Sequence, residues 1–156
     1  MITIQHILDE KQIQNVKKIM DDEIKTALCT TVPLYQSYNN MHFKYKDNEL
    51  ISSLFNRMLK EAEKSINESL KIFGSWFNIC KEDSIFDYHS HKNTILTCVY
   101  FLENCEGNGT IFNIYNSYLQ LLCKDNSMII FDPTISHTIP PWRGKNRYTI
   151  AMDFVK

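Results

Sequence analysis

Gly74-Ser75-Trp76-Phe77-Asn78-Ile79-Cys80 is the stretch at which the hydrophobic pattern of the chain changes. Before it, apolar residues recur at intervals of three and four, which is the period of an amphipathic helix. Within it, Trp76, Asn78 and Cys80 alternate with Phe77 and Ile79, which is the two-residue period of a β-strand. The stretch therefore divides a chain that is predicted to be helical first and β-sheet afterwards.

Short segments rich in β-branched and aromatic residues follow this stretch, at 94–102, 110–115, 118–122, 128–131 and 147–155. Turn-forming residues separate several of these segments, at 106–109, 124–126 and 132–133. About seven or eight short strands in roughly eighty residues are typical of an antiparallel jelly roll, the double-stranded β-helix.

Two amphipathic helices are predicted before the sheet. The first covers 10–28, and Asp9 stands where an N-cap is expected. The second covers 48–72, with Asp47 as its cap and Gly74 as the residue that ends it. Between them, 32–36 is expected to be extended, because the residue before Pro33 avoids helical backbone angles.

These elements predict the α+β class and a single domain over residues 1–156. Residues 1–74 are expected to form a mainly helical cover packed on one outer face. Residues 75–156 are expected to form the jelly-roll core that carries a metal site. A chain of 156 residues is long enough to bury roughly 68–70% of its unfolded surface in one core.

The composition gives little reason to expect a nucleic acid or a membrane as a partner. The net charge is −1, and no apolar run approaches the roughly 18–20 residues of a membrane-spanning helix. The N-terminus shows no signal-peptide pattern. The five cysteines are odd in number and form no Cys-x-x-Cys pair, so free thiols in the cytoplasm are the expectation.

Asp87-Tyr88-His89-Ser90-His91 holds the first candidate metal ligands. In a β-strand, His89 and His91 would point to the same face and could converge on one ion. His137, which follows the apolar run 128–131 and the turn at 132–133, is the third candidate. Asp87 lies on the same face as the pair and is an alternative ligand. If there is no metal site, the two histidines would be a solvated pair at a strand edge or part of a hydrogen-bond network.

Arg147 and Thr149 share one face of the last predicted strand. A guanidinium and a hydroxyl at this spacing can bind a carboxylate through charge-assisted hydrogen bonds. The alternatives are an exposed arginine at the start of a strand, or a basic group with Arg143 and Lys145 that receives an acidic substrate or a phosphate.

The order His89-x-His91, His137 and, ten residues later, Arg147 resembles the iron(II)- and 2-oxoglutarate-dependent oxygenases. The likeness is greatest to short phage-type members that carry His-x-His, and it covers about residues 75–154. The fragments that carry it are 75–79, 96–102, 109–112, 131–133, 137–140 and 147–151.

The resemblance implies a dioxygenase that hydroxylates a small molecule or a peptide. His89, His91 and His137 would hold iron(II), and Arg147, Thr149 and Asn78 would bind the cosubstrate 2-oxoglutarate. No catalytic residue is implied beyond the metal ligands.

The chain departs from the family at the second ligand, because His91 stands where a carboxylate is usual. Three neutral imidazoles leave the +2 charge of the metal uncompensated and shift the preference towards a softer ion that favours nitrogen ligands, zinc included. A three-histidine jelly-roll metalloenzyme without 2-oxoglutarate and a non-catalytic jelly-roll binding protein therefore remain as alternatives. We favour His91 over Asp87 as the ligand, and we expect His91→Asp to retain iron.

Overall fold

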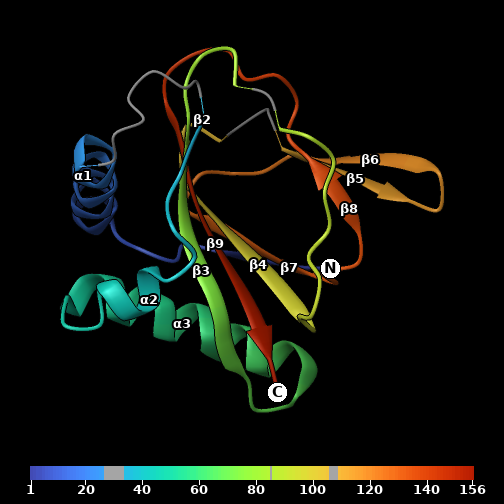
Figure 1. Ribbon diagram of the computed structural model, residues 1–156, viewed down its shortest axis with the longest axis horizontal. Helices are drawn as coiled ribbons and strands as arrows, with labels where there is room; N and C mark the ends of the chain where they lie inside the picture. Colours follow the sequence, from blue (N-terminus) through green and yellow to red (C-terminus); the bar gives the residue numbers. More distant parts are fainter. Residues whose placement is uncertain (27–33, 85, 106–108) are drawn as a thin grey trace.

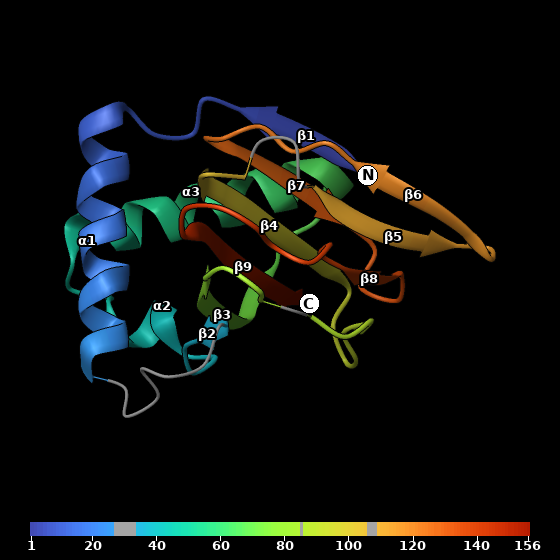
Figure 2. The ribbon, with the colours of Figure 1, turned by 90° about the horizontal axis from the view of Figure 1, so that it is seen from above.

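The computed structural model describes residues 1–26, 34–84, 86–105 and 109–156. Two antiparallel sheets face each other, and the helices lie on the far side of the larger sheet (Figures 1 and 2). The larger sheet has the strand order β1-β7-β4-β9-β3-β2, and the smaller sheet has the order β6-β5-β8. The elements are β1 (Ile2–Gln5), α1 (Glu10–Thr26), β2 (Leu34–Gln36), α2 (Met41–Lys44), α3 (Glu49–Ile66), β3 (Lys71–Cys80), β4 (Leu96–Glu103), β5 (Thr110–Ile114), β6 (Ser117–Leu121), β7 (Ser127–Phe131), β8 (Ser136–Thr138) and β9 (Arg147–Val155).

Strand β9 shows how the alternation of residues divides the interior. Its even-numbered residues, Tyr148, Ile150, Met152 and Phe154, are buried in the core between the larger sheet and the helices. Its odd-numbered residues point to the opposite face, because successive side chains of a strand alternate. A second, smaller cluster fills part of the space between the sheets, and its buried members are Phe101, Cys105, Phe112, Cys123, Ile129 and Phe131.

Helix α1 begins where its capping residues predict. The main-chain N–H of Gln12 donates to Asp9 Oδ1 at 2.8 Å, and the N–H of Asp9 donates to Gln12 Oε1 at 3.0 Å. This reciprocal pair satisfies two donors that the first helical turn leaves free. The prediction of Asp9 as a cap is confirmed, whereas residues 27–28 of the predicted helix lie outside the described part of the chain.

Two predictions about helix α3, its N-cap and its last residue, are wrong. Its cap is Asn48 rather than Asp47, since Asn48 Oδ1 accepts from the N–H of Ile51 at 3.0 Å. It ends at Ile66 instead of 72, because Asn67 adopts a left-handed conformation with φ 55°. Leu70 is buried as an extension of the helical stripe would require, but it belongs to the loop before β3.

The strands of the jelly roll agree with the predicted ones, and the fold class is confirmed. Two features differ. Residues 2–5 form β1, which pairs with β7, although no strand was expected there. Strand β3 starts at Lys71, and Gly74 lies at a register shift in its pairing with β9 instead of ending a helix.

Four cysteines, Cys80, Cys98, Cys105 and Cys123, are free, as expected. All four are also buried, and Cys29 lies outside the described residues. In the described ranges, no helix has the length and apolar character needed to span a bilayer.

Candidate metal centre

The three predicted histidines come together between the two sheets. His137 is on β8, and the main chains of His89 and His137 exchange two hydrogen bonds of 3.0 and 2.9 Å. The N–H of His91 donates to the carbonyl of Pro133 at 2.9 Å. Residues 87–91 therefore form an extended connection with one isolated bridge, and their interpretation as a strand is wrong. Extended backbone nevertheless directs His89 and His91 to the same side.

The imidazole rings are close enough to share one ion. One ligand atom from each of His89, His91 and His137 lies within 4.8 Å of the others. The ring centroids are 4.4 Å apart for His89 and His137, 5.3 Å for His91 and His137, and 5.4 Å for His89 and His91. Among the described residues, His89, His91 and His137 form the one group of possible metal ligands whose donor atoms lie this close together. Asp87 does not belong to this group.

Each imidazole is held through its Nδ1 atom. His89 Nδ1 bonds the carbonyl of Asp87 at 2.9 Å, and His137 Nδ1 bonds the carbonyl of Ile135 at 3.0 Å. His91 Nδ1 bonds Asp153 Oδ2 at 2.7 Å. Since carbonyl and carboxylate oxygens accept, the Nδ1 atoms carry the protons and the Nε2 lone pairs are free for a ligand bond.

Two observations show that this donor set fits a divalent transition-metal ion. The Nε2 atom of His91 is buried and has no hydrogen-bond partner among the residues that the structure describes, although buried polar atoms are normally paired. Burial lowers the pKa of His137 to about 4, so this ring is neutral, as a metal ligand must be, at neutral pH.

The predicted anion-binding residues line the same cavity as the histidines. Asn78 on β3 is paired with Thr149 on β9. Two residues further along each strand, Cys80 on β3 is paired with Arg147 on β9. Together with His89, His91 and His137 they surround a cavity of about 60 Å³. The Oδ1 atom of Asn78 is buried and has no hydrogen-bond partner in the described part of the chain. The amide oxygen of Asn78 is therefore available to a small ligand in this cavity.

Arg147 is a buried cation, and the described residues provide no counter-ion for it. Its side chain is 3% exposed, and among the described residues no carboxylate forms an ion pair with it. Its Nη1 donates to Cys80 Sγ at 3.8 Å, and its guanidinium carbon lies 5.6 Å from the centre of the Phe101 ring. Its Nε has no hydrogen-bond partner in the described ranges. Burial raises the pKa of the Cys80 thiol and that of Cys105, the latter to about 12, so both thiols are neutral near pH 7.

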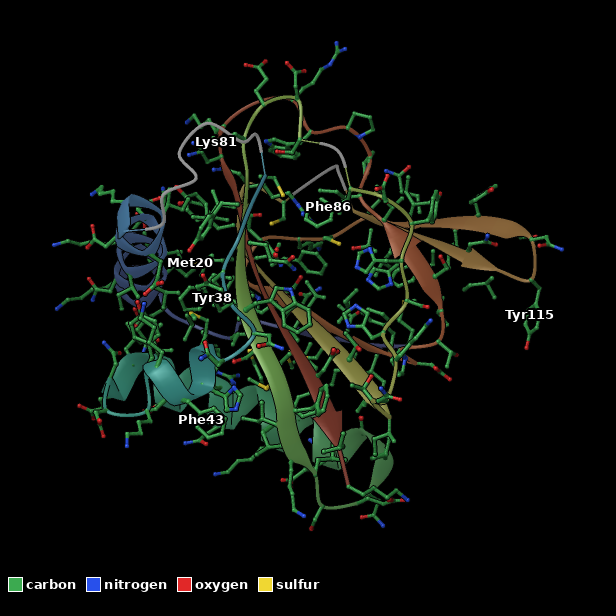
Figure 3. All side chains as sticks on the ribbon, viewed as in Figure 1. Met20, Tyr38, Phe43, Lys81, Phe86 and Tyr115 are labelled. Carbon is green, nitrogen blue, oxygen red and sulfur yellow. The ribbon has the colours of Figure 1, made fainter. Side chains whose placement is uncertain are left out.

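A wider cleft of about 600 Å³ leads from the solvent to the histidines. Trp76 and Phe86 belong to both the cleft and the inner cavity. Trp76 stacks on His91 with a centroid distance of 5.6 Å, and Phe86 stacks on His89 at 6.3 Å. Phe86 can be found between the sheets in Figure 3. Polar side chains on β2 and the loop after it, Gln36, Ser37 and Asn39, form another part of the cleft wall.

Asp153 bonds a candidate ligand, and sequence reasoning did not identify it. A signal was available, because Asp153 shares the odd-numbered register of β9 with Arg147 and Thr149. It is the one carboxylate in an otherwise uncharged run from 148 to 155. Its partner His91 is 62 residues away in the sequence, and the pattern of β9 alone does not specify that contact.

No family model matches the chain, and no curated protein matches it. Solved structures do match. HygX from Streptomyces hygroscopicus, with nickel and 2-oxoglutarate bound, superposes with a TM-score of 0.72 at 8% identity, over 98% of this chain and 81% of that one. A 2OG-Fe(II) oxygenase-family oxidoreductase from Burkholderia pseudomallei gives 0.68 at 9% identity, over 97% and 83%.

The viral collagen prolyl hydroxylase from Paramecium bursaria Chlorella virus-1, as its 2-oxoglutarate complex, gives a TM-score of 0.63 at 12% identity, over 98% of this chain and 94% of that one. Identities this low bear on the fold alone. The chain thus has the double-stranded β-helix fold that these 2OG-Fe(II) oxygenases share, as its sequence motifs predicted.

Proposed function

We propose that this chain is an iron(II)- and 2-oxoglutarate-dependent dioxygenase that acts as one domain. In this proposal His89, His91 and His137 hold the metal through Nε2. Arg147, with Thr149, binds the distal carboxylate of 2-oxoglutarate, and Asn78 binds its keto acid end. When bound, iron(II) and 2-oxoglutarate supply the chemistry by which dioxygen oxidises a substrate while the cosubstrate is decarboxylated to succinate.

The unpaired charge of Arg147 is the observation that carries this proposal. An uncompensated buried charge costs several kcal/mol, so buried arginines are normally paired. Arg147 keeps its charge inside the jelly roll, on the wall of the cavity that the three imidazoles also line. A dicarboxylate that reaches both groups would neutralise the guanidinium and complete the coordination of the metal.

The remaining lining residues have supporting roles in this proposal. Val99 and Ala151 give the inner cavity apolar walls, which limit access of water to the bound cosubstrate. Trp76 and Phe86 would hold the ring planes of His91 and His89, on which they stack, and would narrow the passage from the outer cleft to the inner cavity. The substrate would then approach through the outer cleft.

The structural neighbours support this cofactor set and the type of substrate. HygX was crystallised with nickel, 2-oxoglutarate and hygromycin B, and the epimerase SnoN with Fe3+, α-ketoglutarate and nogalamycin RO. Prolyl hydroxylases are also among the neighbours. We accordingly propose a small molecule or a peptide as the substrate, without identifying it.

A three-histidine metalloenzyme that uses no 2-oxoglutarate is the second candidate. It is favoured because the converging donor atoms found in the described part of the chain include no carboxylate, which leaves the charge of a divalent ion uncompensated within the ligand set. It gives no role to the buried charge of Arg147.

The test is an anaerobic titration of the iron(II) protein with 2-oxoglutarate, followed by the visible charge-transfer absorption of the bound cosubstrate. Admission of air should then produce succinate. His137→Ala is the matched negative control, since it removes one ligand and leaves Arg147 in place. Iron binding without 2-oxoglutarate binding would favour the second candidate, and a protein that binds no metal would contradict both.

A further inference from the structure

Asp153 is a buried carboxylate with two fixed partners. Its Oδ2 accepts from His91 Nδ1 at 2.7 Å, and its Oδ1 accepts from Thr97 Oγ1 at 2.6 Å. Thr97 is directly opposite Asp153 in the pairing of β4 with β9, so the sheet itself fixes this carboxylate. In the described part of the chain, no lysine or arginine pairs with it. Burying an anion in this way is costly unless a positive charge is close.

The three histidines differ in what holds them. His89 and His137 bond neutral main-chain carbonyls, whereas His91 bonds a carboxylate. A divalent ion on three neutral imidazoles keeps its charge of +2, and the guanidinium of Arg147 lines the same cavity. Among the described residues, Asp153 is the carboxylate that bonds one of these three imidazoles, that of His91.

We infer that Asp153 is a positioning residue of the metal centre, and that it supplies through His91 the negative charge that the ligand set itself lacks. The inference rests on the metal centre of the proposed function but not on the use of 2-oxoglutarate. The carboxylate holds the proton on Nδ1, which leaves the Nε2 lone pair directed to the metal, and its charge makes His91 a stronger donor. Trp76, stacked on the ring at an interplanar angle of 20°, fixes the remaining rotation.

This arrangement changes the expectation for His91→Asp. An aspartate carboxylate is shorter than an imidazole, and one of its oxygens falls near the place of Nδ1, facing Asp153. Two buried carboxylates would then repel each other, and the new ligand would not reach as far as Nε2 does. We therefore expect His91→Asp alone to bind metal weakly, and His91→Asp combined with Asp153→Asn to bind it more tightly than the single variant.

The experiment measures the cobalt(II) affinity of the metal-free protein by titration, using visible absorption and competition with a chelator. Asp153→Asn keeps the shape and can still accept from His91, but it removes the charge. It should weaken cobalt(II) binding about tenfold to a hundredfold, which is the usual effect of losing such a partner. Thr97→Val, which frees one oxygen of Asp153, should weaken binding by a smaller factor.

Asp125→Asn is the matched control. The Asp125 carboxylate also accepts two hydrogen bonds, from the N–H groups of Asn104 and Cys105, and among the described residues it forms no hydrogen bond or ion pair with His89, His91 or His137. Its loss should leave cobalt(II) affinity unchanged. In a His91→Ala background, Asp153→Asn should have no further effect on affinity, because Asp153 acts through His91.

The outcomes separate this inference from the proposed function. Equal cobalt(II) affinity of wild type and Asp153→Asn would overturn the inference and leave the metal centre standing. A loss of affinity that is as large in the His91→Ala background as in the wild type would also overturn it, because Asp153 would then act only on folding. Failure of the wild-type protein to bind cobalt(II) would contradict the metal centre and the proposed function together.

Discussion

Replacing Arg147 by methionine separates a ligand-binding arginine from a structural one. Methionine keeps most of the apolar stem and removes the guanidinium. If Arg147 binds the distal carboxylate of 2-oxoglutarate, the variant loses charge-assisted hydrogen bonds worth roughly 1.5–3 kcal/mol each. A loss of that size corresponds to about tenfold to a hundredfold weaker cosubstrate binding.

The same substitution should not destabilise the free protein. Without a ligand, Arg147 is 3% exposed, and within the described ranges it has no ion-pair partner and leaves its Nε unbonded. Replacing a buried charge by an apolar side chain of similar volume is often neutral or stabilising by about 1–4 kcal/mol. The interaction with the Phe101 ring offsets part of that gain. We therefore expect metal-free Arg147→Met to unfold at the temperature of the wild type or above it.

The assay has two parts, performed on the same protein. Anaerobic titration of the iron(II) form with 2-oxoglutarate measures the cosubstrate, and thermal unfolding of the metal-free form measures stability. Arg143→Met is the control, since Arg143 is exposed in the loop before β9. Arg147→Met that bound 2-oxoglutarate like the wild type, or that lost iron(II) as well, would refute this reasoning. So would a large loss of stability, which would make Arg147 structural.

Three further predictions concern the metal, the pH and the helix cap. His137→Ala should lower metal occupancy sharply, and elemental analysis that finds unchanged metal would remove His137 from the site. In the metal-free protein, burial lowers the pKa of His137 to about 4, so its unfolded state binds a proton at higher pH than the folded state. The contribution of His137 to the free energy of unfolding should therefore be complete above about pH 6.5, and it should fall by up to about 3 kcal/mol as the pH drops towards 4. Denaturant unfolding at several pH values measures this change. A free energy of unfolding that stays constant over that window would contradict the lowered pKa. Asn48→Ala should destabilise the protein by about 1 kcal/mol, measurable as a lower denaturation midpoint, whereas Asp47→Ala should have little effect. A larger loss of stability in Asp47→Ala than in Asn48→Ala would contradict the assignment of Asn48 as the cap.

The sequence predicted most of the fold because jelly-roll strands carry local signals. Alternation and turn residues located the strands of the C-terminal half, and the Asp9 cap located α1. The errors occurred where local signals compete. The stripe of α3 continues in phase to Leu70, but the left-handed Asn67 ends the helix at Ile66. Strand β1 is short, and its partner β7 is more than 120 residues away, so tertiary pairing rather than local pattern specifies it.

The candidate site was predictable to the extent that its residues are spaced regularly. His89 and His91 share a side because any extended segment alternates, even though theirs is not a strand. Asn78, Arg147 and Thr149 followed from strand register in the same way. The contact of His91 with Asp153 was not predictable, because it depends on how a loop settles against β9. The stacking of Trp76 and Phe86 on the ligand rings is a tertiary contact of the same kind.

Strand β9 has a consequence for which changes of length the protein can tolerate. One set of its residues faces the cavity, and the alternate set, from Tyr148 to Phe154, fills the core beneath the helices. Inserting or deleting a single residue within it would exchange the two sets, moving Arg147 and Asp153 towards the hydrophobic core and aromatic rings towards the histidines. Point substitutions can adjust binding and stability separately along this strand, whereas an insertion or deletion loses both together. Variation in chain length is accordingly expected in the loops, and β9 should accept none.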